Sequence, residues 1–112
     1  TFGADVRIIA LDHAGEAIAE SDAAVSTIPP NAEFVVNLPT LDTAQTLLDV
    51  AYAPWPTSLA AAWQSAGGTV VHGLEMLLNQ AVHQVRIFVN GDPSRELPDE
   101  AGVIRAMRAA VE

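Results

Sequence analysis

The stretch that decides the fold is Asp49–Gln80, with the sequence DVAYAPWPTSLAAAWQSAGGTVVHGLEMLLNQ. It contains an apolar run, a proline turn, a helical segment, a Gly-Gly turn and a second apolar run. The first run, Leu47–Tyr52, ends in turn residues and predicts a buried strand with Tyr52 at its carboxyl end. The second run, Thr69–His72, predicts the next strand. The stretch is therefore expected to be a strand-helix-strand unit.

A helix is expected between these two strands. Thr57 can cap its first turn, because a hydroxyl oxygen can accept a hydrogen bond from a free amide of that turn. The residues expected to face inward recur at helical spacing and are Leu59, Ala62, Trp63 and Ala66. In an open α/β sheet, ligands bind beside the carboxyl ends of the strands, so Tyr52 is expected where a ligand would lie.

The segment from about Leu74 to Asn90 predicts a helix with two apolar stripes instead of one. The main stripe comprises Leu74, Leu77, Leu78, Ala81, Val82, Val85, Phe88 and Val89. At about 100° per residue, a separate face collects Met76, Gln80, His83 and Ile87. A helix that buries one face in its own domain should be polar elsewhere. The second stripe therefore predicts contact with another domain or subunit.

The sequence before this region predicts two more strands. Val6–Leu11 is expected to be a strand, and Asp12 to cap a short helix that runs through Glu20. A second strand is expected at Ala23–Thr27. The segment from Asn31 to Thr46 is polar and interrupted by proline, and its structure is left open, with one helical turn as an alternative.

After Asn90, the sequence GDPSRELPDE carries turn residues and predicts a loop. The final segment, Glu100–Val111, predicts a helix, with Val103, Ile104 and Met107 on one side. Strands alternate with helices along the chain, which is typical of a parallel sheet with crossover helices. The fold class is therefore α/β, expected as a partial Rossmann-like nucleotide-binding domain with helices flanking a parallel sheet, followed by C-terminal helices.

Composition and charge exclude several classes of partner. The chain has 112 residues, 50% of them hydrophobic, which is enough for one domain with a modest core. Its net charge of −9 offers no positive field for phosphates, so neither nucleic acid nor an anionic membrane is expected as a partner. No apolar run has the length of a membrane span. With no cysteine, the composition fits a reducing cytoplasm, where the protein is expected.

Two motifs resemble a known family. They are D-V-x-Y-x-P-x-x-T-x-L from Asp49 and, after the Gly-Gly turn, G-L-x-M-L-x-x-Q-A from Gly73. In order and spacing they are similar to the C-terminal part of shikimate dehydrogenase, the NADP-dependent enzyme of aromatic amino-acid (chorismate) biosynthesis that reversibly reduces 3-dehydroshikimate to shikimate. The resemblance covers Asp49–Phe88, and the segment PWPTSLAAA is most similar to the sequences of actinobacterial members.

The resemblance implies roles for individual residues. Tyr52 and Gln80 would bind the hydroxyls or carboxylate of shikimate, and the backbone at Val50 and Gly73 would lie against the nicotinamide half of NADP. The family usually has N-A-T-P at the cofactor cleft.

At the corresponding place this chain has Ser26 and Thr27, followed by Ile28 and Pro29. Ser26 and Thr27 are therefore expected as cofactor-binding residues, although the asparagine and the threonine hydroxyl of the usual motif are missing. That departure weakens the expected cofactor contacts.

The resemblance also implies the domain organisation. Residues 1–73 would form the C-terminal part of the NADP-binding domain, and the helices in 74–112 would contact an N-terminal substrate domain that this chain lacks. No Gly-rich phosphate-binding turn is present, and the chain contains no lysine, whereas the family uses a catalytic lysine and aspartate. The chain is thus expected to be an inactive fragment of an enzyme, without catalytic residues of its own.

Alternatives remain at this stage. A quinate-using or NAD-preferring relative is one, and a non-catalytic binding or assembly module of the same fold is another. A homodimer is also left open. His72 and His83 lack partners at metal-ligand spacing, so no metal site is expected.

The order of strands in a dinucleotide-binding sheet, 3-2-1-4-5-6, gives a prediction about pairing. Ala23–Thr27, Leu47–Tyr52 and Thr69–His72 would be strands four to six of one parallel sheet. Val6–Leu11 would lack its usual neighbours, and is expected either to pair with Ala23–Thr27 or to be exchanged with another chain.

Overall fold

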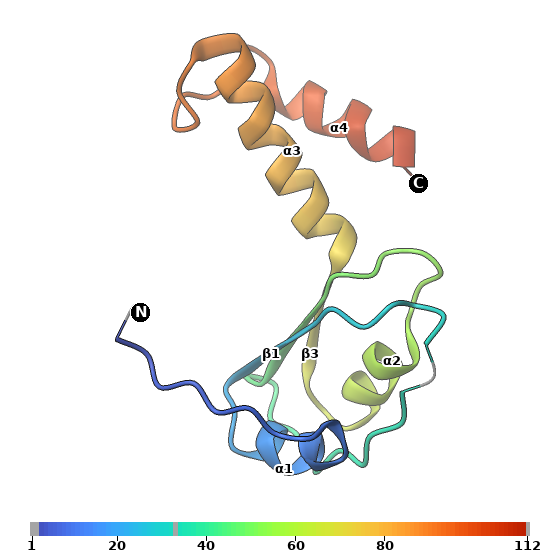
Figure 1. Ribbon diagram of the computed structural model, residues 1–112. Coiled ribbons are helices and arrows are strands. Elements are labelled where there is room, and N and C mark those ends of the chain that lie inside the picture. Colours follow the sequence, from blue (N-terminus) through green and yellow to red (C-terminus); the bar gives the residue numbers. More distant parts are fainter. Residues whose placement is uncertain (1–2, 33, 112) are drawn as a thin grey trace. The chain divides into compact units, whose positions relative to one another are not determined.

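The computed structural model describes residues 3–32 and 34–111, which form two compact units, Thr1–Val71 and His72–Glu112. The boundary lies two residues before the predicted division, which followed residue 73. The first unit contains a small sheet and two short α-helices, and the second contains two longer helices (Figure 1). The predicted α/β class is confirmed.

The sheet of the first unit has three parallel strands in the order of the sequence. They are β1 (Ala23–Ser26), β2 (Thr46–Asp49) and β3 (Thr69–His72). In the register of β1 with β2, Ala23 faces Thr46 and Ser26 faces Asp49. The predicted parallel pairing of three consecutive strands is confirmed, and β2 ends three residues before Tyr52.

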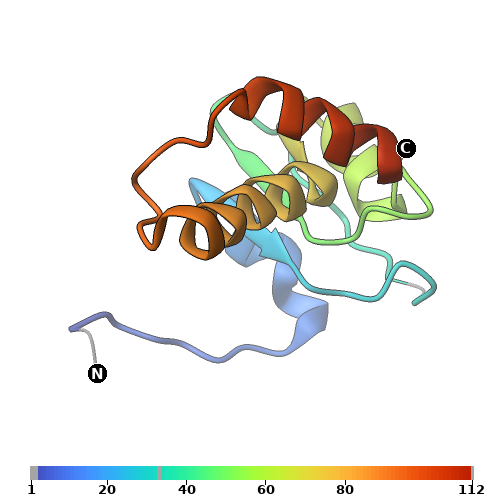
Figure 2. The same ribbon diagram turned by 90° about the horizontal axis from the view of Figure 1, so that it is seen from above.

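The core lies on one face of this sheet, where α2 (Ser58–Ser65) packs (Figures 1 and 2). Its centre is formed by Leu41, Leu47 and Trp63, each at most 6% exposed. Trp63 also donates a hydrogen bond from Nε1 to the carbonyl oxygen of Gln45, at 3.0 Å, so its one polar atom is satisfied. The residues around this centre come from both helices, from β1 and β3 and from the connecting segments: Ile18, Ala24, Leu38, Leu59, Ala66 and Val70.

The turn after α2 explains its two glycines. Gly67 has φ +105°, a conformation that L side chains rarely adopt, and a Cβ there would lie 2.7 Å from the carbonyl oxygen of Leu41. At Gly68, a Cβ would collide with the indole of Trp63. Both positions therefore require glycine, as the predicted helix stop implies.

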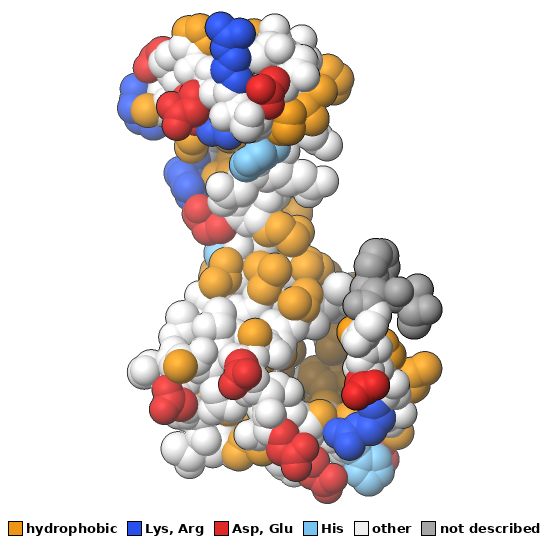
Figure 3. Space-filling view, turned by 90° about the vertical axis from the view of Figure 1, so that its left-hand side faces the viewer, with side chains coloured by type: hydrophobic (Ala, Val, Ile, Leu, Met, Phe, Trp, Pro, Cys, Tyr) orange, Lys and Arg blue, Asp and Glu red, His pale blue; other side chains and the backbone are white. Residues whose placement is uncertain are grey.

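The opposite face of the sheet carries exposed apolar side chains. Val25 is 63% exposed and Val71 is 38% exposed. Parallel sheets are usually covered on both faces. Hydrophobic side chains are also visible on the surface in Figure 3.

The predicted strand at Val6–Leu11 is wrong. Residues 4–10 are extended without strand pairing, Val6 is 85% exposed and Ile8 is 94% exposed. A strand is stable only when its amide and carbonyl groups are paired, and β1 has only β2 as its neighbour among the described residues. The predicted pairing with Ala23–Thr27 is therefore also wrong.

The cap predicted at Asp12 is wrong as well. Leu11–His13 form a 3₁₀ turn that contains Asp12, and α1 (Ala14–Ala19) follows directly with no side-chain cap at His13. The described residues between 31 and 45 form turns and extended segments, without the helical turn that was left open.

The second unit consists of α3 (Gly73–Asn90) and α4 (Glu100–Val111), joined by a loop. His72 caps α3, because its Nδ1 accepts a hydrogen bond from the amide of Leu74 at 2.8 Å. Gly91 ends α3 with φ +70°, the left-handed conformation usual at a helix C-terminus. The predicted limits of both helices are confirmed within one residue.

Only part of the predicted main stripe of α3 is buried. Leu78 and Val82 are each 5% exposed, whereas Phe88 and Val89 are 84% and 62% exposed, so the stripe was extended too far. The last turn of α3 leads into the loop and has no covering element among the described residues of this unit. On the second stripe, Met76 is 37% exposed.

Two arginine-glutamate pairs fasten α3 to α4. Arg86 forms a bidentate pair with Glu100, at 2.6 and 2.7 Å, and the Arg86 Nη1 also donates to the carbonyl oxygen of Pro93. Arg108 pairs with Glu75 at 2.6 and 3.1 Å. The hydrogen bonds from the arginines lower the pKa of Glu100 and of Glu75 below the usual range.

Candidate functional site

A hollow of about 340 Å³ lies just beyond the carboxyl ends of β1 and β2. Three of the residues that the resemblance singled out line it together: Thr27, Val50 and Tyr52. The rest of its lining is Ile28, Pro29, Pro30, Ala51 and Ala53. Its position is the one at which parallel α/β sheets bind ligands, and its surface is largely apolar.

The two predicted cofactor residues of β1 have different surroundings. Thr27 is exposed and borders the hollow. Ser26 is only 7% exposed, and its hydroxyl oxygen accepts a hydrogen bond from the amide of Ile28 at 3.4 Å. Ser26 thus shapes the turn that leads to the hollow, and it lines a separate small cavity of about 20 Å³.

The segment after β2 carries the other wall of the hollow. The amide of Val50 donates a hydrogen bond to the carbonyl oxygen of Ser26 at 3.0 Å, which extends the pairing of β1 and β2 by one bond. Tyr52 lies two residues further on and is 49% exposed. Its ring can therefore contribute to packing against the hollow while its hydroxyl remains accessible to a polar ligand.

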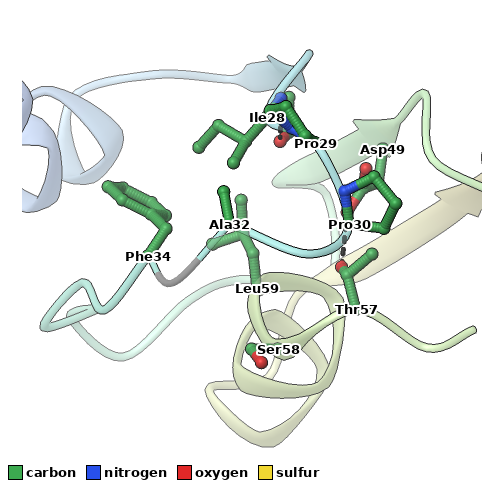
Figure 4. A pocket seen from close by; sticks show the side chains of 10 residues that line it. Ile28, Pro29, Pro30, Ala32, Phe34, Asp49, Thr57, Ser58 and Leu59 are labelled. Atoms are coloured by element: carbon green, nitrogen blue, oxygen red, sulfur yellow. Dashed lines mark hydrogen bonds between the residues drawn. The ribbon is translucent and has the colours of Figure 1, made fainter. Parts of the chain in front are cut away.

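Asp49 organises the base of this segment (Figure 4). It is 1% exposed, and both of its carboxyl oxygens are used: Oδ1 accepts from the amide of Ala51 at 3.1 Å, and Oδ2 accepts from the hydroxyl of Thr57. The Thr57 hydroxyl in turn accepts from the amide of Ala60 at 3.1 Å, which is the predicted cap of α2. Asp49 thus accepts one hydrogen bond from the backbone and one from a hydroxyl group.

The remaining predicted site residues, Gly73 and Gln80, lie on α3 in the second unit. Gly73 is buried at the first position of the helix, and Gln80 is exposed two turns later. Met76 and Ile87, on the same face, are 37% and 48% exposed. Gln80 is thus an accessible amide between apolar side chains.

His83 shares this face of α3. Its Nδ1 lies 2.8 Å from the carbonyl oxygen of Asn79, within hydrogen-bond distance. Among the residues that the structure describes, no cluster of three or more histidine and acidic side chains could hold a metal ion.

Two prolines line the hollow as well: the resemblance had placed Pro29 at the expected cofactor cleft, whereas Pro30 was not expected there. Pro29 and Pro30 line it directly after β1, and Figure 4 shows them close to Asp49. Proline after a strand removes an amide donor and fixes the backbone, and this local signal was available in the sequence. The fully buried Ala60 of α2 was missed too, because a small residue carries little periodic signal.

The described helices are too short or too polar to cross a membrane.

The fold and the hollow define a class of protein. A parallel sheet with a crossover helix, here α2 between β2 and β3, and a ligand-sized hollow at the strand ends is the architecture of nucleotide-binding α/β proteins. Within this class, the chain is similar to curated NADP(+)-dependent shikimate dehydrogenases, and no family model matches it.

Two of the sequence relatives come from Staphylococcus haemolyticus and Leptospira interrogans. The shikimate dehydrogenase (NADP(+)) of Staphylococcus haemolyticus is 26% identical over 98 residues, 84% of this chain and 37% of that protein. The enzyme of the same name from Leptospira interrogans is 41% identical over 51 residues, 46% of this chain and 18% of that protein. The chain therefore spans well under half the length of these relatives.

Two of the structural relatives are mycobacterial. Shikimate dehydrogenase of Mycobacterium tuberculosis matches with a TM-score of 0.61 and 36% identity, over 88% of this chain and 35% of that one. Shikimate 5-dehydrogenase of Mycobacterium fortuitum matches with a TM-score of 0.59 and 39% identity, over 92% and 35%. The resemblance to shikimate dehydrogenase, including its actinobacterial members, is confirmed in sequence and in fold.

Proposed function

We propose that this chain forms the cofactor-side part of an NADP-dependent shikimate dehydrogenase, which interconverts 3-dehydroshikimate and shikimate. The observation that carries the proposal is the hollow at the ends of β1 and β2, because Thr27, Val50 and Tyr52 meet there. These residues were assigned to cofactor and substrate from motifs alone. Their convergence in one hollow supports both assignments.

The lining of the hollow fits a flat, weakly polar ring such as nicotinamide. Most of its walls are aliphatic or proline side chains, and the extended backbone at Val50 and Ala51 forms one side. NADP, when bound, would supply or accept the hydride. This chain would provide the surface that orients the ring and excludes water.

Substrate binding is assigned to Tyr52 and Gln80. Tyr52 offers an accessible hydroxyl, and Gln80 offers an amide that can both donate and accept. Both groups suit the hydroxyls or carboxylate of shikimate. The exposed second stripe of α3 would contact a substrate domain that supplies the catalytic lysine and aspartate.

Cofactor contacts and the cellular location belong to the proposal too. Thr27 and the backbone at Val50 and Gly73 would border the cofactor, while Ser26 would act through the turn it shapes. A chain without cysteine suits a reducing cytoplasm, where the enzyme would work.

The test uses the longer polypeptide that carries this chain together with the sequence before it. Purified from a host that lacks its own shikimate dehydrogenase, it should form NADPH from NADP and shikimate. Quinate and NAD are the comparison substrates, and a preference for either would assign the protein to the alternative dehydrogenase. A folded polypeptide that oxidises neither shikimate nor quinate, with either NADP or NAD, would overturn the proposal and favour a non-catalytic module.

A further inference from the structure

One buried acidic residue beside the hollow has no role in the function proposed above. Asp49 is 1% exposed, and among the described residues no buried side-chain nitrogen or oxygen atom lacks a hydrogen-bond partner. A buried carboxyl group is costly unless its oxygens are satisfied, so its hydrogen bonds must serve a structural or functional purpose.

The partners of Asp49 lie at the two ends of one loop. Ala51 donates to Oδ1 at the start of the loop 50–57, and Thr57 donates to Oδ2 at its end. Both ends of the loop are therefore hydrogen-bonded to one side chain, that of Asp49, which is the last residue of β2. Figure 4 shows the bond from Thr57, at the start of α2, to Asp49 at the end of the strand.

The base of the loop is also fixed on the side of β1. Asp49 faces Ser26 in the strand register, and the amide of Val50 donates to the carbonyl oxygen of Ser26. The loop carries Val50 and Tyr52, which form one wall of the hollow, while Thr27 lies on the other wall. The orientation of Tyr52 toward Thr27 thus depends on where Asp49 holds the loop.

We propose that Asp49 is a positioning residue of this site: it fixes the loop 50–57 so that Tyr52 meets its ligand in a productive orientation. The inference rests on the proposed function for its kinetic part. Asparagine is a poorer replacement for Asp49, because its amide group is neutral and has one acceptor oxygen and one donor nitrogen. Either Ala51 loses its acceptor, or Thr57 must reverse its bond and accept from the amide nitrogen, and in both cases the bonds lose the charge of the carboxylate.

The first experiment measures the loop without reference to activity. Asp49→Asn in this chain should raise amide hydrogen exchange at Ala51 about tenfold, while amides between β1 and β2 remain protected. Asp42→Asn is the matched control, since Asp42 Oδ1 accepts from Ala44 at 2.8 Å in the same two-residue pattern on an exposed turn. Unchanged exchange at Ala51 would overturn the proposal.

The second experiment asks whether Asp49 acts through Tyr52. In the longer polypeptide, Asp49→Asn should lower kcat/KM for shikimate about tenfold, and the same change in a Tyr52→Phe background should cost less than about twofold. Additive losses in this double-mutant cycle would mean that Asp49 only stabilises the fold, which would overturn the proposal.

Variants of Thr57 test the same hydrogen bond from its other partner, in case the Asp49→Asn variant does not fold. Thr57→Val removes one of the two hydrogen bonds to Asp49 and should reproduce part of the loss in kcat/KM. Thr57→Ser keeps the hydroxyl and should retain the wild-type kcat/KM. If the wild-type polypeptide oxidises no shikimate, the proposed function fails. The exchange experiment still decides whether Asp49 positions the loop.

Discussion

At the residue scale, the site depends on a few side chains whose polar atoms have defined partners. Asp49 and Thr57 use their oxygens within the protein, while the hydroxyl of Tyr52 and the amide of Gln80 lie on accessible side chains. A buried polar group that is satisfied internally holds structure, whereas an accessible one can bind a ligand. This difference separates the positioning residues from the proposed binding residues.

Gln80→Ala tests the binding role of the amide in the longer polypeptide. Loss of one neutral hydrogen-bonding group costs about 0.5 to 1.5 kcal/mol, so kcat/KM for shikimate should fall up to about tenfold while NADP affinity hardly changes. Gln84→Ala is the control, since Gln84 is an exposed amide one turn further along α3. Equal kinetics for the two variants would leave Gln80 as a surface amide.

Two glycines offer a matched pair for stability. Gly67→Ala combines φ +105° with a Cβ 2.7 Å from the carbonyl oxygen of Leu41, so it should cost about 3 kcal/mol or more in unfolding free energy. Gly91→Ala has φ +70° and no atom within 4 Å, so it should cost only about 1 kcal/mol. Urea titrations of both variants would measure this difference, and equal losses would contradict the argument.

At the element scale, α2 and the α3–α4 pair are stabilised differently. The helix α2 contributes the core residue Trp63 and begins at the Thr57 cap, so its stability comes from burial and a local hydrogen bond. The α3–α4 pair buries fewer large side chains and is joined by the Arg86–Glu100 and Arg108–Glu75 ion pairs. It should therefore respond more strongly to pH and salt.

The pH dependence of the helix pair follows from its lowered carboxyl pKa values. Since the folded pKa of Glu100 lies below the unfolded value of about 4.3, its ion pair stabilises the fold above that pH. The contribution is lost as pH falls through the folded pKa. Relative to the intrinsic exchange rate at each pH, the protection of the α4 amides should accordingly fall on acidification in the wild type.

Glu100→Gln should remove most of this change, because the Arg86–Glu100 side chains are only 15% and 14% exposed. Glu75→Gln should remove less, since the Arg108–Glu75 side chains are 37% and 46% exposed and solvent screens them. A larger effect at Glu75 than at Glu100 would show that the ranking by exposure is wrong.

At the scale of the whole molecule, the chain is one part of a longer catalytic architecture in the proteins it resembles. It covers 35% of each mycobacterial structure, and it contains neither a lysine nor a Gly-rich phosphate-binding turn. The proposed catalytic groups would lie in the sequence that those relatives have and this chain lacks.

The chain by itself should therefore not oxidise shikimate. Loss of a general acid-base group alone slows catalysis about 10²- to 10⁴-fold, and without the Gly-rich turn NADP should also bind weakly. The measurement is NADPH formation by the pure chain, with the longer polypeptide as the positive control. Turnover by the chain at a rate near that of the control would contradict the assignment of catalytic residues outside it.

The sequence by itself determined the elements whose signals are local. The strand Thr69–His72 and the helix Glu100–Val111 have their predicted limits, and Thr57 caps α2 as expected. Side-chain periodicity, a capping hydroxyl and a glycine turn act within a few residues, so they can be recognised without the fold. The motifs around Tyr52 and Gln80 also gave the resemblance that the relatives confirm.

Only the tertiary structure decided what depends on distant partners. Val6–Leu11 has the composition of a strand, but a strand requires a neighbour to pair with, and none of the described residues provides one. Phe88 and Val89 continue the apolar period of α3 without a surface that covers them. The convergence of Thr27, Val50 and Tyr52 in one hollow likewise arises from the parallel pairing of β1 with β2, because that pairing brings the ends of two strands together.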